Sequence, residues 1–599
     1  MHWHDDGEEI KRDIPNKEII RWMAGFFKPH GKSLMLAIPL MLAAIFLQLQ
    51  IPRIIRIIID KNIVSGSITD VYFSIGKIVG FSLLSLVFGY IWQVTLGRIG
   101  LRIITTVKKK MLRHVMDLDL KFFADYPPGT LIARVESDTE KLRQLFTDAA
   151  FNMLRTMIMV GGVVYYMLNE NTGVALTILT IVPVLIVMTI LFLRFIRKYY
   201  KVLRDKWANI LKFVTEYVQG VDIIQLYNYD KMAMQRLKEK NLDRFRIERA
   251  AAFIEYGFWG FFWACEVVAV MIALSTGTSR IVNGTMTVGT LIMFLEYIRQ
   301  VFFPLMMFSE QLNFIQRGLV SAERVYKILH MKSRIQDPEN PRFEPALKEE
   351  IEFEHVFFGY ESDRHVLKDV SFKVKRGEKV ALVGTSGGGK STIVNLICRF
   401  YDPTEGRILL DGVDIKEFNQ KEWRELIGLV LQDVYLFPGS IADNLRVMDP
   451  DIPLSKVEEA AGIVRADEFI RRMKEGYQSE LAERGANLSA GERQLLSFAR
   501  AMTFDPPLLI LDEATSSVDP HTERLIQEGI DKLLKGRTSI VVAHRLSTIL
   551  NADKIVVIDQ GIVAEEGTHA ELIEKGGIYK HLYELQFAGI SLDRGGGVA

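Results

Sequence analysis

The chain has 599 residues and nearly balanced charge, with 74 Lys and Arg against 73 Asp and Glu. This length corresponds to roughly four average domains, so the chain can bury substantial cores. The lack of a basic excess argues against a nucleic-acid partner. The two cysteines, Cys265 and Cys398, lie too far apart for a disulfide framework or a four-cysteine metal site. A hydrophobic share of 49% beside 25% charged residues indicates an apolar part joined to a soluble part.

Six apolar segments before residue 310 are candidates for crossing a bilayer, which takes about 20 mostly apolar residues for each helix. They lie near Leu34–Leu49, Ile75–Leu96, Met153–Leu168, Val174–Leu193, Phe258–Leu274 and Leu291–Phe308. A buried helix of a soluble protein can mimic one such segment, but six in succession indicate a membrane domain. The sequence therefore predicts a multidomain membrane protein. Its all-α transmembrane domain of six helices covers residues 33–330, after a cytoplasmic segment, 1–32, that can hold an elbow helix.

Lys and Arg are distributed unequally around these segments. The short connections 60–70, 169–173 and 276–287 contain only Lys61 and Arg280 between them. The long connections Arg98–Arg143 and Arg194–Arg249, and the start of the chain, are rich in Lys and Arg. The positive-inside rule therefore predicts that both termini and both long connections are cytoplasmic. The first residues are acidic, unlike those of a signal or transit peptide, so we expect neither. We expect a multi-pass protein of a plasma (inner) membrane, of prokaryotic origin.

Each long cytoplasmic connection has helical spacing and no long apolar run. At 1.5 Å per residue, helical hairpins of this length extend tens of Å beyond the membrane. Gly and Pro interrupt the pattern at Pro127–Gly129 and at Gly220, where we expect each hairpin to turn. Such turns could contact a cytoplasmic domain, and solvated hairpins without a partner are the alternative.

The polar stretch 331–349 contains Pro338, Pro341 and Pro345 and is predicted to be a linker. Beyond it, short β-rich runs alternate with helical stretches, which is typical of an α/β sheet. We therefore expect an α/β domain over residues 350–587, which the motifs described next identify as a P-loop NTPase domain, and a flexible tail over residues 588–599.

The P-loop prediction depends on a strand, a glycine-rich loop and a helix in succession. The strand Lys379–Gly384 leads into a loop of nine residues and then into the helix Ile393–Phe400. The loop reads Gly384, Thr385, Ser386, Gly387, Gly388, Gly389, Lys390, Ser391, Thr392. Its backbone N–H groups are expected to surround phosphate oxygens. Lys390 is expected to reach the β- and γ-phosphates of a nucleotide, and the Ser391 hydroxyl to bind Mg²⁺.

Two further apolar strands end in polar residues. Leu508–Leu511 is followed by Asp512, placed to hold Mg²⁺, and by Glu513, which can orient or deprotonate the attacking water. Such an acidic pair is often only structural, but its occurrence behind a P-loop favours catalysis. The strand Thr538–Ala543 is followed by His544, at a position where sensors of the γ-phosphate tend to lie.

The chain resembles an ABC exporter half-transporter over nearly its full length. Residues Ala486–Gln494, which contain Ser489 and Gly491, match the signature motif of that family. Asp519 ends a run that resembles the D-loop, Gln432 resembles the Q-loop glutamine that assists Mg²⁺ binding, and Tyr360 resembles the adenine-stacking aromatic residue. Two other matches are the short exporter motif Glu483–Gly485 and the coupling regions Gly129–Arg134 and Tyr217–Gly220.

The resemblance implies a dimer that binds ATP and Mg²⁺. In this family ATP lies between the P-loop of one chain and the signature motif of the other, so a single chain does not complete a site. Closure of the dimer is transmitted through the long cytoplasmic helices and turns the membrane cavity outward. The predicted hairpin turns would be the coupling helices that contact the ATPase domains.

The signature motif departs from the family pattern Leu-Ser-Gly-Gly-Gln at two positions. Ala490 adds a methyl group where backbone approaches the γ-phosphate, and Glu492 adds a negative charge near a polyanion. Lys390 and Glu513 are nevertheless intact. This combination resembles heterodimeric ABC exporters, in which the partner carries an intact signature and a compromised catalytic carboxylate. We therefore favour a related second half-transporter chain as partner, and a homodimer that tolerates an altered signature is the alternative.

The substrate is constrained least by the sequence. Glu266 lies among aromatic residues of the fifth apolar segment and is a substrate-cavity candidate for an amphipathic cation. Glu296 and Arg299 are three residues apart and are expected to neutralise one another. We expect ATP-driven export of small hydrophobic or amphipathic compounds, drug-like or lipid-like, by a protein in contact with membrane lipid. An importer and a nucleotide-gated channel or sensor are the alternatives, and the intact Glu513 argues against the channel.

Overall fold

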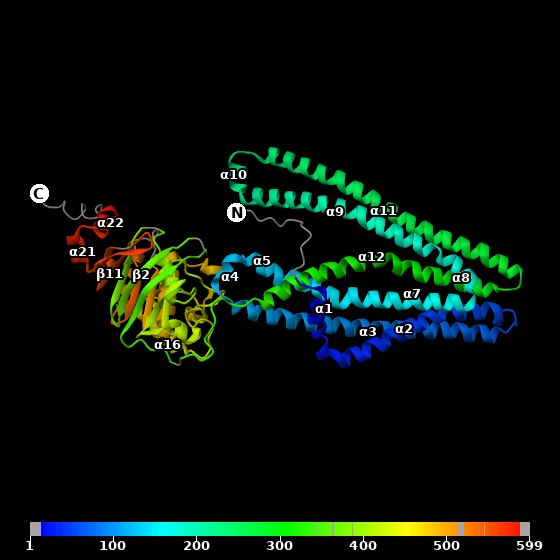
Figure 1. The fold of residues 1–599 in the computed structure, drawn as a ribbon, viewed down its shortest axis with the longest axis horizontal. Helices are drawn as coiled ribbons and strands as arrows, with labels where there is room; N and C mark the ends of the chain where they lie inside the picture. The colour runs from blue at the N-terminus through cyan, green and yellow to red at the C-terminus, as the bar shows by residue number, and fades with distance from the viewer. Residues whose placement is uncertain are drawn as a thin grey trace. The chain divides into compact units, whose positions relative to one another are not determined.

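The computed structural model describes residues 14–342, 344–361, 364–385, 387–512, 520–543 and 546–587 (Figure 1). The chain divides into two compact units. The first comprises Met1–Asp117 and Tyr126–Met331, and its described part is helical. The second comprises Leu118–Asp125 and Lys332–Ala599 and contains the β-sheets. The predicted tail, 588–599, lies outside the described residues.

The α-helices of the first unit have between six and 53 residues. They are α1 (Asn16–Gly25), α2 (Gly31–Ile57), α3 (Ile68–Met116), α5 (Pro128–Ala133), α6 (Thr139–Gln144), α7 (Ala150–Glu170), α8 (Thr172–Leu179), α9 (Ile181–Gln219), α10 (Val221–Leu226), α11 (Asp230–Val282) and α12 (Val288–His330).

Five helical stretches of the described residues are long and apolar enough to cross a membrane. They are Lys28–Asn62, Ile68–Met116, Pro128–Glu170, Thr172–Gln219 and Asp230–Val282. These stretches contain the first five predicted segments. The sixth predicted segment, Leu291–Phe308, lies in α12, which is not one of the five.

The fourth predicted segment is not one continuous helix. It is divided at Thr180, where α8 ends and α9 begins. Pro183 explains the break, because a proline ring clashes with the carbonyl group four residues earlier and lacks an N–H group to donate.

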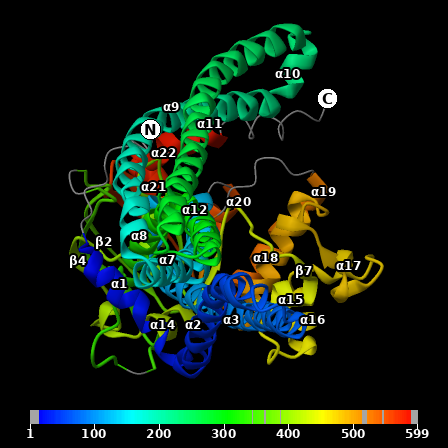
Figure 2. The same cartoon turned by 90° about the vertical axis from the view of Figure 1, so that its right-hand side faces the viewer.

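The helices extend well beyond a bilayer, and the predicted turns are confirmed. Helix α3 has 49 residues and α11 has 53. At 1.5 Å per residue they are roughly 75–80 Å long, against about 30 Å for a hydrocarbon core. Helix α9 ends immediately before Gly220, and α5 begins at Pro128. In two views α10 stands apart from α3, α7 and α12, at the tip of the hairpin that α9 and α11 form (Figure 1, Figure 2).

The core of the first unit is made by stripes of apolar side chains. On α11, Phe258, Phe262, Cys265, Ala269 and Ala273 are buried at the spacing of one helix face. They pack with buried residues of α2, α7 and α12. Many large apolar side chains on the outer faces are exposed, as expected for helices whose outer faces contact lipid.

Polar contacts join α2, α7 and α12 at the ends predicted to be extracellular. A short π-helical turn, Ile58–Asn62, carries Asp60, which accepts hydrogen bonds from Thr287 Oγ1 at 2.5 Å and from the N–H of Gly289 at 2.8 Å. Arg56 forms an ion pair with Glu170 at the end of α7. A Cβ at Gly289 would lie 2.6 Å from the Asp60 side chain, so glycine is required for this approach.

The second unit contains two main sheets. The antiparallel sheet has the order β2-β1-β4-β5, with β1 (Glu350–Phe358), β2 (Leu367–Lys375), β4 (Glu405–Leu410) and β5 (Val413–Asp414). The other sheet has the order β12-β11-β3-β10-β9-β6 and is parallel except for β12. Its strands are β3 (Lys379–Val383), β6 (Ile427–Val430), β9 (Leu508–Asp512), β10 (Thr538–Val542), β11 (Lys554–Asp559) and β12 (Ile562–Gly567).

The mainly parallel sheet is buried on both faces. Alternate residues of β9 belong to two different cores: Leu508 and Ile510 to one, Leu509 and Leu511 to the other. The first core also contains α13 (Lys390–Ile397) and the antiparallel sheet. The second contains residues of α16 (Leu454–Ile463), α18 (Ala490–Phe504) and α19 (Pro520–Leu534). Burial of both faces explains why these strands read as continuous apolar runs.

A short segment before the first predicted turn belongs to the second unit. It contains α4 (Leu120–Asp125). The Asp119 carboxylate accepts a hydrogen bond from the N–H of Arg334 at 2.7 Å, and Lys121 Nζ donates to the Tyr360 carbonyl oxygen at 2.9 Å. A cavity of about 200 Å³ lies between this segment and the end of β1.

Candidate nucleotide-binding site

The predicted site residues follow neighbouring strands of the parallel sheet. The P-loop follows β3, which pairs with β10, and β10 pairs in turn with β9, where Val542 is level with Asp512. Strand β6 lies beyond β9, and Gln432 comes two residues after it. The carboxyl ends of parallel strands meet at one edge, which is where open α/β sheets bind ligands. The topology therefore brings the P-loop, Gln432 and Asp512 to one edge.

Steric contacts explain why glycine occupies the ends of the P-loop. A Cβ at Gly384, where φ is +155°, would lie 2.0 Å from the Ile558 carbonyl oxygen. A Cβ at Gly389, where φ is +109°, would lie 2.6 Å from Leu367 Cδ2. Gly389 is also the residue immediately before α13, so the free N–H groups at the start of that helix face the loop.

Lys390 begins α13, three residues before the helix start expected from the sequence. Its side chain is 7% exposed, and Nζ donates to the carbonyl oxygens of Gly384 at 2.8 Å and Thr385 at 2.9 Å. Burial lowers the pKa of Lys390, and the nearby Asp512 opposes that shift. The ammonium group is thus enclosed by the loop, where it can exchange carbonyl partners for phosphate oxygens.

The donor groups at this edge fit a magnesium ion. Ser391 offers a hydroxyl group, Gln432 an amide carbonyl group and Asp512 a carboxylate, and Mg²⁺ prefers oxygen donors. Ser391 and Gln432 are exposed and Asp512 is half-buried. Among the described residues there is no cluster of three or more His, Cys, Asp or Glu side chains suited to a metal. The set of Ser391, Gln432 and Asp512 instead matches a magnesium ion that is held by one carboxylate together with substrate phosphates.

Tyr360 lies against the P-loop helix. Its hydroxyl group is 3.3 Å from Thr392 Oγ1 and accepts a hydrogen bond from Asn395 Nδ2 at 3.1 Å. The Tyr360 and Tyr401 rings form an edge-to-face contact, with their centroids 5.2 Å apart. These contacts fix the ring beside α13, and its role in adenine stacking stays a prediction.

The signature segment forms the start of α18. Ser489 Oγ accepts a hydrogen bond from the N–H of Glu492 at 3.3 Å, and the Glu492 carboxylate accepts one from the N–H of Ser489 at 2.8 Å. This reciprocal pair is a capping box, and the spacing Ser-x-x-Glu could have identified it in the sequence. Glu492 therefore has a structural role that the sequence analysis missed. Gly491 is buried, whereas Ala490 is exposed.

Two arginines of α18, which the sequence analysis did not select, support this segment. Arg493 Nη1 donates to the Leu488 carbonyl oxygen at 2.6 Å. Arg500 donates to the carbonyl oxygens of Asn444 and Tyr435, both at 3.0 Å, and burial lowers its pKa. Helix α18 thus connects the signature with the segment that follows Gln432. No sequence pattern distinguishes these arginines from others on a polar helix face.

Four predicted site residues, Ser386, Glu513, Asp519 and His544, lie outside the described residues. Their roles stay predictions.

The membrane-domain candidates differ from each other. Glu266 is half-buried beside the buried stripe of α11, and it forms no hydrogen bond or ion pair with any described residue. Glu296 and Arg299 form the expected ion pair, at 3.7 Å.

Comparison with known proteins agrees with this architecture. Residues 34–305 match the family model of the ABC transporter transmembrane region, and residues 367–516 match that of the ABC transporter. The chain is 32% identical over 568 residues to an uncharacterised ABC transporter ATP-binding protein, YknV, of Bacillus subtilis, with 94% of each chain covered. The chain belongs to the ABC transporter family. It is therefore an ATP-binding membrane protein whose ATPase activity is coupled to transport.

Two other comparisons point to export. The chain is 33% identical over 577 residues to a Bacillus subtilis protein named "Putative multidrug export ATP-binding/permease protein YgaD", covering 94% of this chain and 98% of that one. It also resembles a solved structure of a bacterial Atm1-family ABC exporter with ATP bound. The TM-score is 0.79 and the identity 26%, over 93% of this chain and 99% of the other. The chain thus has the fold of an ABC exporter.

Proposed function

We propose that this chain is one half of a dimeric ABC exporter that moves small hydrophobic or amphipathic compounds out of the cell. The main support is the sheet edge that gathers Lys390, Gln432 and Asp512 in a chain that also carries membrane-spanning helices. Relatives named as multidrug export proteins support this substrate class. The half-buried Glu266, which has no partner among the described residues, supports a cavity that accepts amphipathic cations.

The proposed ATP site divides the work among several residues. Lys390 and the P-loop N–H groups bind the phosphates, and Tyr360 stacks on the adenine ring. Glu513 orients and deprotonates the attacking water, while His544 contacts the γ-phosphate. Ser391 and Asp512, with Gln432, would hold Mg²⁺, which when bound neutralises charge on the β- and γ-phosphates. Ser489, Gly491 and Asp519 would face the nucleotide of the partner chain.

Exposed apolar residues near α10 support a second chain. Val218, Ile223, Leu226 and Tyr227 are each 64–74% exposed, although they lie on a hairpin predicted to be cytoplasmic. Several large apolar side chains exposed to water within ten residues of one hairpin turn favour an interaction site there. The coupling regions Tyr217–Gly220 and Gly129–Arg134 would transmit closure of the dimer, the first to the partner and the second within the chain.

The capping box supports a heterodimer over a homodimer. The Glu492 carboxylate accepts a hydrogen bond from the N–H group of Ser489. This N–H group lies at the helix end where the partner's ATP would present its γ-phosphate. A negative charge there repels phosphate. A related partner with an intact signature would complete the site built on Lys390 and Glu513, which hydrolyses ATP. The site that Ser489 completes would mainly retain nucleotide.

Inverted membrane vesicles test the export proposal. ATP should drive accumulation of a cationic amphipathic dye, and Glu513→Gln should abolish accumulation while leaving ATP binding intact. ATP-driven loss of dye from loaded inverted vesicles would indicate an importer. Dye movement down its gradient that ATP binding alone permits would indicate a channel.

Purification from the native membrane tests the heterodimer. We expect a second, related chain in equal amount. A stable complex of this chain alone, with ATPase activity stimulated by substrate, would instead establish a homodimer.

A further inference from the structure

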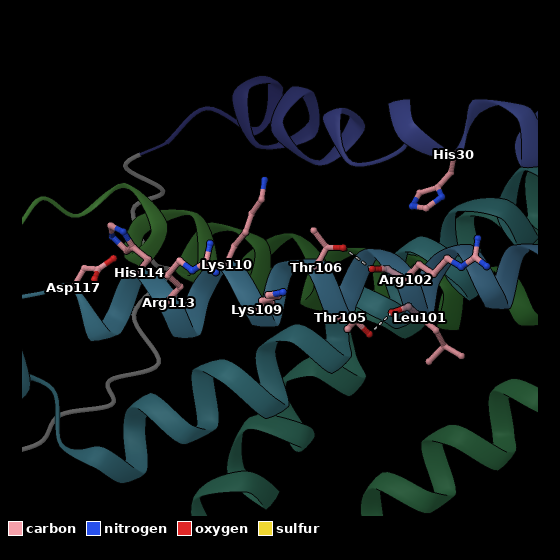
Figure 3. Close-up of a pocket in the computed structure, with 10 residues that line it drawn as sticks. All are labelled: His30, Leu101, Arg102, Thr105, Thr106, Lys109, Lys110, Arg113, His114 and Asp117. Carbon is pink, nitrogen blue, oxygen red and sulfur yellow. Dashed lines mark hydrogen bonds between the residues drawn. The ribbon is translucent and has the colours of Figure 1, made fainter. Parts of the chain in front are cut away.

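A groove of about 820 Å³ runs along the C-terminal half of α3, which is predicted to be cytoplasmic (Figure 3). We name it the basic groove, because six of the side chains that line it are His30, Arg102, Lys109, Lys110, Arg113 and His114. Asp117 is the one acidic residue among the described residues of its lining. Figure 3 shows the cationic row along α3, with His30 above the Arg102 end.

Among the residues that the structure describes, the cations of the basic groove have no acidic partners. Arg102, Lys109 and Arg113 form no side-chain hydrogen bond or ion pair with any described residue, and Lys110 lies over the Phe26 ring at 5.8 Å. Lys108, on the same helix but outside the groove, is paired with Glu136. On the neighbouring face of α3, Lys108 therefore has a carboxylate partner, whereas the cations of the basic groove have none among the described residues. Clustered, uncompensated cations favour binding of an anion.

The hydroxyl groups of the groove are already engaged. Thr105 donates to the Leu101 carbonyl oxygen at 2.8 Å, and Thr106 to that of Arg102 at 2.9 Å. The donors that remain for a ligand are therefore the charged ones, which suit phosphate oxygens.

One end of the basic groove lies at the level where two helices enter the apolar region. His30 directly precedes α2, and Arg102 follows the apolar segment of α3 that ends near Leu96. Leu101, beside Arg102, is 56% exposed and also lines the groove. Lys109 and Arg113 lie roughly 10–16 Å farther along α3 at 1.5 Å per residue. An apolar side chain thus meets the cations at the predicted boundary of the cytoplasmic leaflet.

We propose that the basic groove binds the phosphate-bearing head group of an anionic phospholipid from the cytoplasmic leaflet. Arg102 and His30 contact the phosphate at the membrane surface, Lys109 and Arg113 extend the field toward a long or doubly charged head group, and an acyl chain passes Leu101. Free phosphate offers the same charge, but it has no need of an apolar residue at the upper end. The boundary position therefore favours a lipid.

Reconstitution of the full chain, with whatever partner chain copurifies, tests this proposal. Vesicles of phosphatidylcholine with and without phosphatidylglycerol are compared, and the phosphatidylglycerol retained per chain is measured by native mass spectrometry. The test variant is Arg102→Gln/Lys109→Gln/Arg113→Gln. The matched control, Lys421→Gln/Lys456→Gln/Lys535→Gln, removes the same charge from exposed positions of the second unit.

We expect the preference for phosphatidylglycerol to fall by about a hundredfold in the test variant, because each cation near a membrane surface contributes about fivefold. The control should retain the wild-type preference. Unchanged retention in a test variant that keeps its monodispersity and its ATPase activity in phosphatidylcholine would overturn the proposal. Displacement of the lipid by millimolar inorganic phosphate would assign the groove to a soluble anion and would also overturn it. If the test variant misfolds, the single variant Lys109→Gln is used, with an expected loss of about fivefold.

Discussion

The P-loop and the signature segment belong to one compact unit, yet they tolerate side chains very differently. In the P-loop, the backbone at Gly384 and Gly389 approaches neighbouring atoms so closely that a single methyl group would overlap them. The signature segment is an exposed helix start, where Ser489 and Glu492 satisfy each other's N–H groups and Ala490 points to open space.

This difference teaches where sequence change is permitted. A backbone contact fixes the start of the P-loop, because no side chain can be added at Gly384 without moving β11, which carries Ile558. Side chains build the signature segment, so the fold survives their replacement while the charge presented to a nucleotide changes. Steric constraint therefore protects the P-loop, and the altered signature is compatible with a folded unit.

The largest expected effect comes from adding one carbon to the P-loop. Gly384→Ala places a Cβ against the Ile558 carbonyl oxygen, so we expect loss of ATP binding and a fall of about 3–5 kcal/mol in the free energy of unfolding. Gly462→Ala in α16 is the matched control, since nothing lies within 4 Å of that position, and it should change stability by less than about 1 kcal/mol. Denaturant titration and nucleotide binding measure both. Normal ATP affinity in Gly384→Ala would show that the P-loop backbone can shift to accommodate a Cβ at this position.

Lys390→Ala should come next. It removes the buried ammonium group while leaving the loop backbone intact, so ATP affinity should fall about tenfold to a hundredfold with little change in folding. Titration with a fluorescent ATP analogue measures this, and Lys421→Ala, at an exposed position, serves as control. Equal affinities in the two variants would remove Lys390 from the site.

Arg500→Met sharpens the comparison from the helix that carries the signature. The change leaves the carbonyl groups of Tyr435 and Asn444 without their donor, at about 1–3 kcal/mol for each carbonyl group that becomes buried and unpaired. We expect lower stability and ATPase activity. Arg471→Met, whose side chain is 75% exposed beside Asp467, should change stability by less than about 1 kcal/mol. A neutral Arg500→Met would mean that α18 does not depend on this connection.

The smallest effect is expected at the signature itself. The double change Ala490→Gly with Glu492→Gln keeps a capping box, because glutamine can accept the same hydrogen bond, and removes one negative charge. Unfolding free energy should change by less than about 1 kcal/mol. Nucleotide retention should rise severalfold with little change in maximal turnover. A parallel rise in turnover would mean that both sites hydrolyse, which contradicts the heterodimer.

Much of this unit could be predicted from the sequence, because its strands are short apolar runs bounded by characteristic residues. The P-loop and the strand ending in Asp512 are local patterns, and the parallel order of the sheet brings them together. In the first unit, the helical breaks at Gly220 and Pro128 were also predictable, because glycine and proline are local signals of a turn. Pro183 could also have predicted the division at Thr180, but that segment was assigned as one span because it contains no charged residue.

Other features depend on contacts between distant residues and carry no local signal. The assignment of Leu118–Asp125 to the second unit depends on Asp119 and Lys121 meeting backbone atoms more than 200 residues away. Arg102 has no ion pair with any described residue, and this too depends on which distant residues the fold brings near it. The number of charged residues in a sequence does not show which of them form ion pairs in the fold.

The contacts of Asp60 have a consequence for leakage. Before a passage can form between α2 and α12 at their outer ends, Asp60 must release Thr287 and the N–H of Gly289. Passage between α2 and α7 requires Arg56 to part from Glu170. Each charge-assisted contact contributes about 1.5–3 kcal/mol, so thermal fluctuation alone seldom breaks them together. These contacts thus hold together the ends of α2, α7 and α12 that are predicted to be extracellular, and they oppose passive leakage between those helices.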